Sequence, residues 1–261
     1  MSKLSSATQL LLLSFALPAL TGCYKVIDYA YHHPGDEVKI CRIEKIVFDN
    51  DDNATATFSY NVNNDPVSIR EDNTVLFQPL DYYFRYDAQH RLTDYIECYY
   101  HAVGAMIWHR YSYPDKWTIV DSQFNYVGLI TDPEPPHSGI TAYTYKYTLD
   151  AWGRIIKSFD YFGPTITSYS YDSRGNLVRP GVQYDDKVNI YRTSSAFMLT
   201  RMDYSANNPL PGTQTIDSYN TYCLPTRYTS RSGHTTNELF GYYYTGASVR
   251  YACDIGWQPA K

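Results

Sequence analysis

The fold of this protein rests on a short segment in the middle of the chain, Tyr169-Ser170-Tyr171-Asp172-Ser173-Arg174-Gly175-Asn176-Leu177. Tyr169 and Tyr171 are two residues apart, so on a β-strand they project from the same face, where aromatic residues pack well. The Asp172 carboxylate can accept hydrogen bonds from backbone N–H groups ahead of it, which favours a turn. Gly175 supplies the positive φ that a type I turn with a following bulge requires, and Leu177 restarts the apolar alternation. The segment therefore predicts a strand end, a tight turn and a new strand.

Degenerate copies of this unit recur along the chain. The copies are Phe58–Asn64, Phe84–Leu92, Tyr145–Ile155, Tyr169–Leu177 and Ser218–Pro225. Asn64 and His90 stand where Gly175 stands, and both residue types tolerate positive φ better than most. Cys223 is the unusual occupant of that position, and the copy around Gly153 is expected to have a slightly longer turn. A spacing of roughly two to three dozen residues indicates a repeated supersecondary unit.

The unit resembles the YD repeats of RHS-type proteins, whose hallmark is Tyr-Asp-x-x-Gly-Arg/Asn-Leu. Tyr171-Asp172 and Gly175-Asn176-Leu177 match that hallmark residue by residue. The resemblance implies an architecture of β-strands and hairpins. It implies no activity, because YD repeats in that family form shells and spacers.

Composition supports the same fold class. The chain has 261 residues, of which 29 are Tyr and 19% are charged, so a folded protein with half-buried strands is expected. Alternating runs such as Thr141–Tyr147 are common. We predict a mainly β fold, an antiparallel meander of hairpins forming a large twisted sheet that curls or partly closes, because free edges are sticky. The formal charge of -5 argues against nucleic acid as a partner.

The N-terminus predicts a signal peptide over residues 1–22. Lys3 is followed by the apolar run Leu10–Leu17, which is shorter than the about 20 residues of a membrane-spanning helix. The motif Leu20-Thr21-Gly22-Cys23 resembles the lipobox of bacterial lipoproteins. That resemblance implies that Cys23 is acylated, and the alternative is an ordinary signal peptide with a chance cysteine. Tyr24, in a place where Asp would indicate inner-membrane retention, favours lipid anchoring at the outer membrane of the cell envelope.

Residues 23–37 are predicted to be a short tether, and residues 38–261 a single β-rich domain with the hairpin repeats. The proline-rich stretch at 132–139 is either a linker that subdivides this domain or a long hairpin loop. Strands of the meander are expected at Val188–Tyr191 and Met198–Tyr204.

Four cysteines follow Cys23, and four cysteines allow three connectivities. Cys41 and Cys253 each lie in an alternating apolar segment, and a sheet that curls toward closure brings its first and last strands together. We therefore predict a Cys41–Cys253 disulfide, with four reduced thiols as the alternative. The chain has no C-x-x-C motif, which argues against zinc and dithiol redox sites.

No catalytic motif, metal site or cofactor site is predicted. His32-His33 lacks further ligands, and Asp49–Asn53 lacks the glycine and the distant glutamate of an EF-hand. The expected function is therefore non-enzymatic: a lipid-anchored envelope protein with a structural or interaction role, whose partners are the membrane through acylated Cys23 and an envelope protein or glycan. The alternative is a carbohydrate-binding lipoprotein that stacks sugars on Trp108, Trp117 and Trp152.

Overall fold

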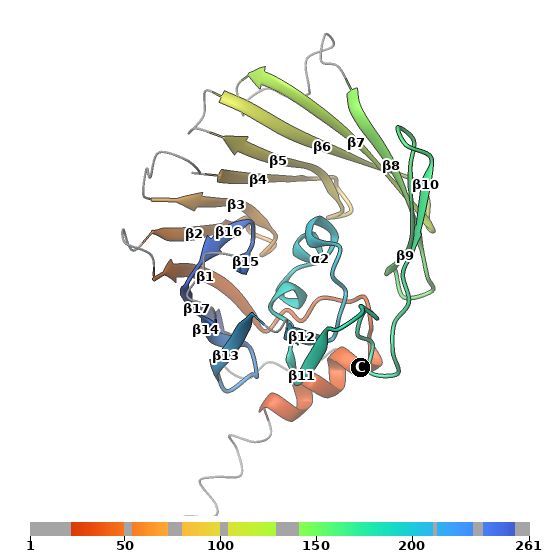
Figure 1. The fold of residues 1–261 in the computed structure, drawn as a ribbon. Helices are drawn as coiled ribbons and strands as arrows, with labels where there is room; N and C mark the ends of the chain where they lie inside the picture. Colours follow the sequence, from red (N-terminus) through yellow and green to blue (C-terminus); the bar gives the residue numbers. More distant parts are fainter. Residues whose placement is uncertain are drawn as a thin grey trace, which may run out of the picture.

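The computed structural model describes residues 22–49, 54–72, 80–99, 104–128, 141–210, 213–231 and 237–253. Within these ranges the chain is mainly β, as the alternating pattern predicted, and most strands form one 13-stranded antiparallel sheet (Figure 1). Its strands are β1 (Cys41–Phe48), β2 (Thr55–Tyr60), β3 (Pro66–Glu71), β4 (Leu80–Tyr86), β5 (Leu92–Tyr99), β6 (Gly104–Asp115), β7 (Thr118–Gly128), β8 (Thr141–Leu149), β9 (Ile155–Asp160), β10 (Thr165–Ser168), β13 (Gln214–Tyr219), β14 (Pro225–Ser230) and β17 (Gly246–Cys253).

Two small sheets and short helices complete the described chain. The strands of these sheets are β11 (Gln183–Val188) with β12 (Asn207–Leu210), and β15 (Asn237–Leu239) with β16 (Tyr242–Tyr244). The helical elements are an N-terminal helix over 22–32, the 3₁₀-helix η1 (Ile190–Thr193) and α2 (Ser195–Arg201).

The large sheet is a meander of ten strands, to which three C-terminal strands are added beside β1. Each strand from β1 to β10 pairs with the next, and β17, β14 and β13 then join the other side of β1. The sheet is open, with β10 and β13 at its edges, although it curls strongly (Figure 1). The first and last strands are neighbours because the C-terminal strands pair onto the free edge of β1. The closure expected from the sequence is not needed for this pairing.

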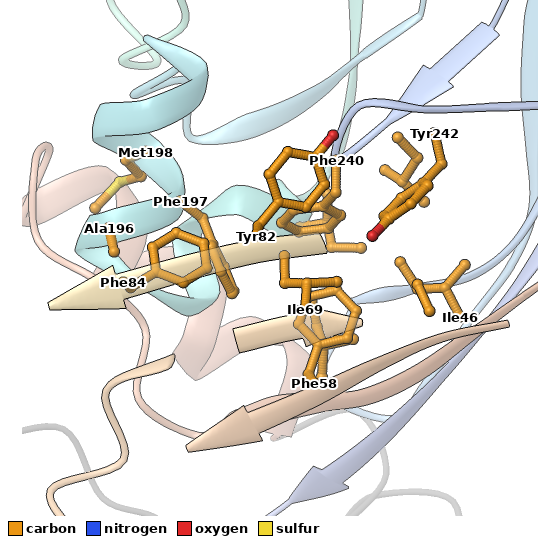
Figure 2. Packing of buried hydrophobic residues seen from close by; sticks show 14 of the residues in the cluster. Ile46, Phe58, Ile69, Tyr82, Phe84, Ala196, Phe197, Met198, Phe240 and Tyr242 are labelled. Atoms are coloured by element: carbon orange, nitrogen blue, oxygen red, sulfur yellow. The ribbon is translucent and has the colours of Figure 1, made fainter. Parts of the chain in front are cut away.

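Helix α2 fills the inside of the curl. The Phe197 ring lies 5.9 Å from that of Phe58 and 4.9 Å from that of Phe240, and both pairs meet edge to face (Figure 2). The strand expected at Met198–Tyr204 was therefore wrong. Ala196 to Leu199 are four successive buried residues, which suits a helix enclosed by the sheet better than a strand with one buried face. Ser194 starts the helix, since its side chain accepts a hydrogen bond from Ala196 N.

Residues 23–37, expected to be a tether, are part of the folded body. Val26 is fully buried (0% exposed) and Ala30 is also buried; they lie on one face of the N-terminal helix, four residues apart. They pack with Val38, Ile40 and other apolar residues. The apolar i, i+4 spacing was the available signal for this helix. Among the described residues, no helix is both long and apolar enough to cross a membrane.

Two predicted boundaries fall largely outside the described residues. Residues 1–21 of the predicted signal peptide and the stretch 132–139 are not described. The strands on either side of 132–139, β7 and β8, pair with each other in the same sheet.

Candidate functional site: the turn rim and its cysteines

Five turns of this protein share one hydrogen-bond pattern. In the turn at 172–176, the Asp172 side chain accepts from Arg174 N at 2.9 Å and from Asn176 N at 2.8 Å, while Gly175 N donates to Asp172 O. The residue three positions after the acceptor always has positive φ: Asn64 (65°), His90 (61°), Gly153 (77°), Gly175 (80°) and Cys223 (62°). The positive φ inferred from the sequence is confirmed at all five positions. The turn at 150–154 is no longer than the others, contrary to expectation.

The same side-chain bonds close the other four turns. Their acceptors are Asn61, Asp87, Asp150 and Asn220, each of which receives the backbone N–H groups two and four residues ahead. Asp and Asn are interchangeable here because either side chain offers an acceptor oxygen. This local closure explains why the unit persists in degenerate copies.

Each turn is also tied to a tyrosine from elsewhere in the chain. The carbonyl five residues after the turn acceptor receives a tyrosine hydroxyl in every copy. The pairs are Tyr86 to Pro66 (2.8 Å), Tyr113 to Leu92 (2.7 Å), Tyr171 to Ile155 (2.9 Å), Tyr184 to Leu177 (2.6 Å) and Tyr251 to Pro225 (2.7 Å). Burial raises the pKa of Tyr86 and Tyr113 far above the usual value. These hydroxyls are therefore structural donors.

The turns lie on one edge of the sheet, which we call the turn rim: residues 61–65, 87–91, 115–117, 150–154, 172–176 and 220–224. Alternate connections of a meander fall on the same edge, which places the β2–β3, β4–β5, β6–β7 and β8–β9 turns together. Neighbouring turns touch: the His90 ring lies 3.0 Å from an Asp65 carboxylate oxygen, and Leu149 N donates to Trp117 O. The turn at 220–224 is on this rim because Asn220 contacts Cys253, the partner of Cys41 at the start of β1.

The structure joins Cys41 to Cys253, the pair proposed from the sequence. The two residues face each other across β1 and β17, with their Cα atoms 4.0 Å apart. A small cavity of about 120 Å³ adjoins this disulfide, lined in part by Lys39, Arg42 and Asn64. Lys39 is paired with Glu37 at 2.7 Å and Arg42 donates to Asn64 at 2.8 Å, so both cations already have polar partners.

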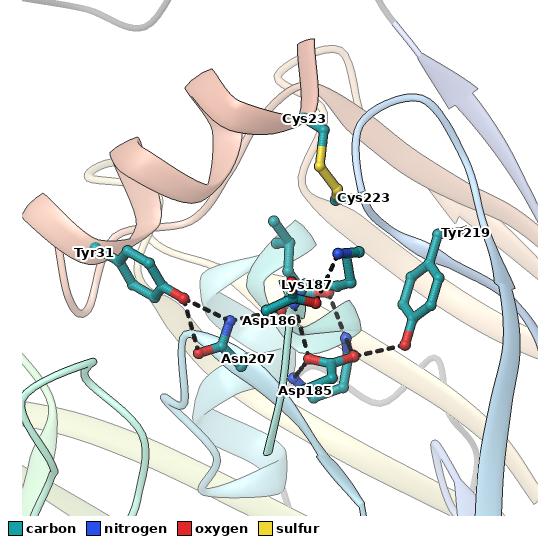
Figure 3. A network of polar contacts seen from close by, with 10 residues as sticks. Cys23, Tyr31, Asp185, Asp186, Lys187, Asn207, Tyr219 and Cys223 are labelled. Atoms are coloured by element: carbon teal, nitrogen blue, oxygen red, sulfur yellow. Dashed lines mark hydrogen bonds and ion pairs between the residues drawn. A yellow bond between two sulfur atoms is a disulfide. The ribbon is translucent and has the colours of Figure 1, made fainter. Parts of the chain in front are cut away.

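Cys23 and Cys223 form a second disulfide, which the sequence did not suggest (Figure 3). Their Cα atoms lie 5.1 Å apart, so the start of the N-terminal helix is fixed to the turn at 220–224. A cysteine sulfur forms one bond beyond its Cβ. Acylation through a thioether and this disulfide are therefore alternative states of Cys23.

The far end of the N-terminal helix is fixed by a buried arginine. Arg192 is buried and donates through Nη2 to His33 O at 2.8 Å, which satisfies a carbonyl at the helix C-terminus. Burial lowers the Arg192 pKa to about 10, which still leaves the guanidinium charged at neutral pH. Tyr31, in the last turn of the helix, donates to Asn207 on β12 (Figure 3). The helix is thus held near Cys23 by the disulfide and at its C-terminal end by Arg192 and Asn207.

The three tryptophans proposed to stack sugars do not form one row. Trp108 is fully buried, at 0% exposure, and donates to Asp94 at 2.7 Å, so its assignment to a sugar site was wrong. The Trp108 side chain lies on the face of the sheet where it packs with Ile96, Cys98 and Met106. Trp117 (43% exposed) and Trp152 (56% exposed) lie on adjacent turns of the rim. Lys116 lies 4.4 Å from the Trp117 ring centre, and Arg154 lies 5.0 Å from that of Trp152.

A polar group inside the curl was missed by sequence reasoning. His109 Nδ1 lies 3.0 Å from an Asp121 oxygen, and Tyr147 donates to the same carboxylate at 3.3 Å. Burial disfavours the charged imidazole, yet the Asp121 hydrogen bond and charge raise its pKa overall. His109 lies opposite Gln123 and Asp121 lies opposite Tyr111 across β6 and β7, so the His109–Asp121 contact is a diagonal one with no local sequence signal. Among the described residues, no group of His, Cys, Asp or Glu could hold a metal ion.

A second polar network joins β11, β12 and β13. Asp185 accepts from the Tyr219 hydroxyl at 2.7 Å and from Asn208 Nδ2 at 2.9 Å (Figure 3). Polar side chains can be placed here away from water because they form hydrogen bonds with one another. The network fixes the connection between the β11–β12 hairpin and the sheet.

Comparisons with known proteins assign no family to the chain. No protein-family model matches the sequence, and no match is found among curated proteins. The functional argument therefore rests on the chain's own motif at Cys23 and on the geometry around it.

Proposed function

We propose that this protein is a lipid-anchored component of a bacterial cell envelope, with a structural or interaction role and no catalysis. The observation that carries the proposal is the motif Leu20-Thr21-Gly22-Cys23 after a short apolar run. The position of Cys23 suits it, because this residue starts the N-terminal helix at the periphery of the fold. Two or more acyl chains on Cys23 would hold the protein stably, since a single chain gives only marginal binding.

Acylation gives the folded body a fixed position relative to the membrane. The Cys23–Cys223 disulfide then forms only in chains whose Cys23 is not acylated, and in the acylated protein Cys223 keeps its thiol, which is buried. Because residues 24–37 are folded and not a flexible tether, the turn rim lies close to the lipid. The repeat turns, each closed by its own side-chain bonds, make this rim a stiff scaffold for a partner, either an envelope protein or a glycan.

Membrane fractionation of Cys23→Ala tests the proposal. We expect the variant to leave the membrane fraction or to accumulate as a precursor of lower mobility, and to lose labelling by a palmitate analogue. The matched control is Cys223→Ala, which removes the same disulfide but keeps the lipidation site, and should stay in the membrane. Equal fractionation of Cys23→Ala and the unchanged protein rejects lipid anchoring.

The alternative function is carbohydrate binding at Trp117 and Trp152. One observation favours it: two exposed indole rings lie on adjacent turns, each backed by a cation. Titration with soluble envelope oligosaccharides should then shift the tryptophan emission, and the shift should vanish in Trp117→Ala/Trp152→Ala. An unchanged emission across the titration argues against this alternative.

A further inference from the structure

The large apolar side chains of the turn rim point to a second membrane contact. Val62, which is 96% exposed, is in the rim turn at 61–65, and Tyr24, which is 72% exposed, follows Cys23, which is joined to the rim turn at 220–224. Each is at a turn tip or at the start of the N-terminal helix. Trp117 and Trp152 join them on the β6–β7 and β8–β9 turns, which are neighbours on this edge, so the two exposed indole rings belong to one stretch of the rim.

We propose that the turn rim rests in the interfacial layer of the bilayer, with Trp117 and Trp152 at the depth of the lipid headgroups. Trp and Tyr concentrate at this depth because the ring is apolar and the N–H or O–H remains hydrated. Lys116, beside the Trp117 ring, can pair there with a lipid phosphate. The inference rests on the proposed acylation of Cys23, which sets the side of the protein that faces lipid.

The position of Cys23 relative to these rings supports the bilayer as the occupant. The helix over 22–32 starts at the Cys223 turn and is about 15 Å long, at 1.5 Å per residue. The segment after the helix then reaches the Trp152 turn, since a Cβ on Gly35 would meet Trp152 O at 1.9 Å. The acylated residue and the exposed indole therefore lie at opposite ends of one short helix. A flat lipid surface can reach both.

The surface of that helix is compatible with headgroups. Tyr24, Lys25, Asp28 and His32 are its exposed residues, and they repeat at helical spacing opposite buried Val26 and Ala30. A polar stripe of mixed charge fits the hydrated headgroup layer and not the acyl chains. The helix therefore lies along the membrane surface, while the aromatic tips reach deepest.

Quenching of tryptophan fluorescence by brominated lipids tests the inference. The lipidated protein is purified from membranes and reconstituted in phosphatidylcholine vesicles with bromine near the headgroup end of the acyl chains. Trp257 is changed to Phe throughout, which leaves Trp108, Trp117 and Trp152 as emitters. We expect a loss of emission relative to unbrominated vesicles, and the loss should disappear in Trp117→Phe/Trp152→Phe because Trp108 is buried.

The controls separate this inference from the anchor. Tyr161→Ser/Phe162→Ser changes exposed aromatics at the opposite edge, in the β9–β10 connection, and should leave the quenching unchanged. If the protein stays in the vesicles but the emission of Trp117 and Trp152 is not quenched, the rim contact is overturned and the lipid anchor is not. A shift of emission by soluble oligosaccharide with no quenching assigns the rings to a glycan and also overturns it. A chain that never enters the membrane fraction overturns both proposals.

Discussion

At the residue scale, the repeat is maintained by one backbone conformation and one acceptor. The five positive-φ positions carry glycine twice and Asn, His and Cys once each. An L-residue in this region costs roughly 1–2 kcal/mol, so the three non-glycine turns depend on their Asp or Asn acceptor bonds. Where the Asp or Asn acceptor is present, the turn forms even if the residue with positive φ three positions later is not glycine. The copies can therefore diverge in sequence.

Two glycines allow the cost of backbone strain to be measured apart from the cost of side-chain crowding. Gly153 has a φ of +77° and a Cβ there would meet nothing within 4 Å; Gly163 also has open space but no positive φ. We expect Gly153→Ala to lower the free energy of unfolding by about 1 kcal/mol, because only the backbone is strained. Gly163→Ala should be neutral or stabilising by about 0.5 kcal/mol. Urea unfolding of both variants measures the difference, and equal stabilities would falsify the turn conformation at 153.

Glu71 gives the fold a dependence on pH. Burial, together with the nearby Asp81 charge, raises its pKa from 4.5 to about 7, and its Oε2 atom has no hydrogen-bond partner among the described residues. A carboxyl group with a raised pKa binds its proton more tightly in the folded state than in the unfolded state. Ionisation of Glu71 therefore destabilises the fold increasingly from about pH 4.5 to about pH 7, and the destabilisation is constant above that pH. Glu71→Gln should therefore stabilise the protein more at pH 8 than at pH 4 in thermal melts. A gain that is the same at both pH values contradicts the raised pKa.

At the element scale, the hairpins are joined by their tyrosines. A tyrosine hydroxyl from a later part of the chain bonds to the carbonyl just beyond each turn, so a later segment secures each hairpin. The same ring packs on the sheet face, as Tyr86 does beside the main core. This double role explains why Tyr and not Phe stands at five of the 29 tyrosine positions.

Removing one such hydroxyl should weaken a hairpin measurably. Tyr86→Phe keeps the ring but leaves Pro66 O without its 2.8 Å donor, so we expect a loss of about 1 kcal/mol. Tyr143→Phe, at an exposed tyrosine of β8, is the control and should be within about 0.5 kcal/mol of the unchanged protein. Denaturant unfolding compares the two. If Tyr86→Phe behaves like the control, the hydroxyl contributes nothing to the tie.

At the scale of the whole molecule, two disulfides near the turn rim link distant parts of the chain. Cys41–Cys253 joins the first and last strands of the sheet across a separation of 212 residues. Both disulfides border one small apolar cluster that includes the N-terminal helix. The rim is thus the place where the start of β1 and the end of β17 are joined.

Loss of the Cys41–Cys253 bond should be the most destabilising of these changes. A loop of this length corresponds to about 5 kcal/mol in the chain-entropy model, an upper figure for the double variant Cys41→Ala/Cys253→Ala. Cys98→Ala removes a buried thiol that lies outside both disulfides and should cost far less. Peptide mapping without reductant checks the connectivity directly. A Cys41 peptide recovered alone or linked to another cysteine rules out the bond.

The sequence by itself determined the turns. Their bonds run between residues at most four positions apart, so Asp172, Gly175 and their counterparts can be recognised without knowing the neighbours. The alternation also predicted that the chain is mainly β, which is confirmed, while lipid anchoring at the motif that ends in Cys23 stays a prediction. The pairing of Cys41 with Cys253 was proposed from the flanking alternation, although the expected closure of the sheet was not the cause.

Only the tertiary structure decided which side of each strand is covered and which distant segments meet. Trp108 is buried because residues from β5 and β6 pack on its face, whereas Trp152 is exposed because its turn projects past the strands. The tyrosine ties, the His109–Asp121 contact and the docked N-terminal helix likewise join residues brought together by packing. The alternation of apolar and polar residues predicts that a strand has two different faces. Which face is buried depends on contacts with elements far away in the sequence.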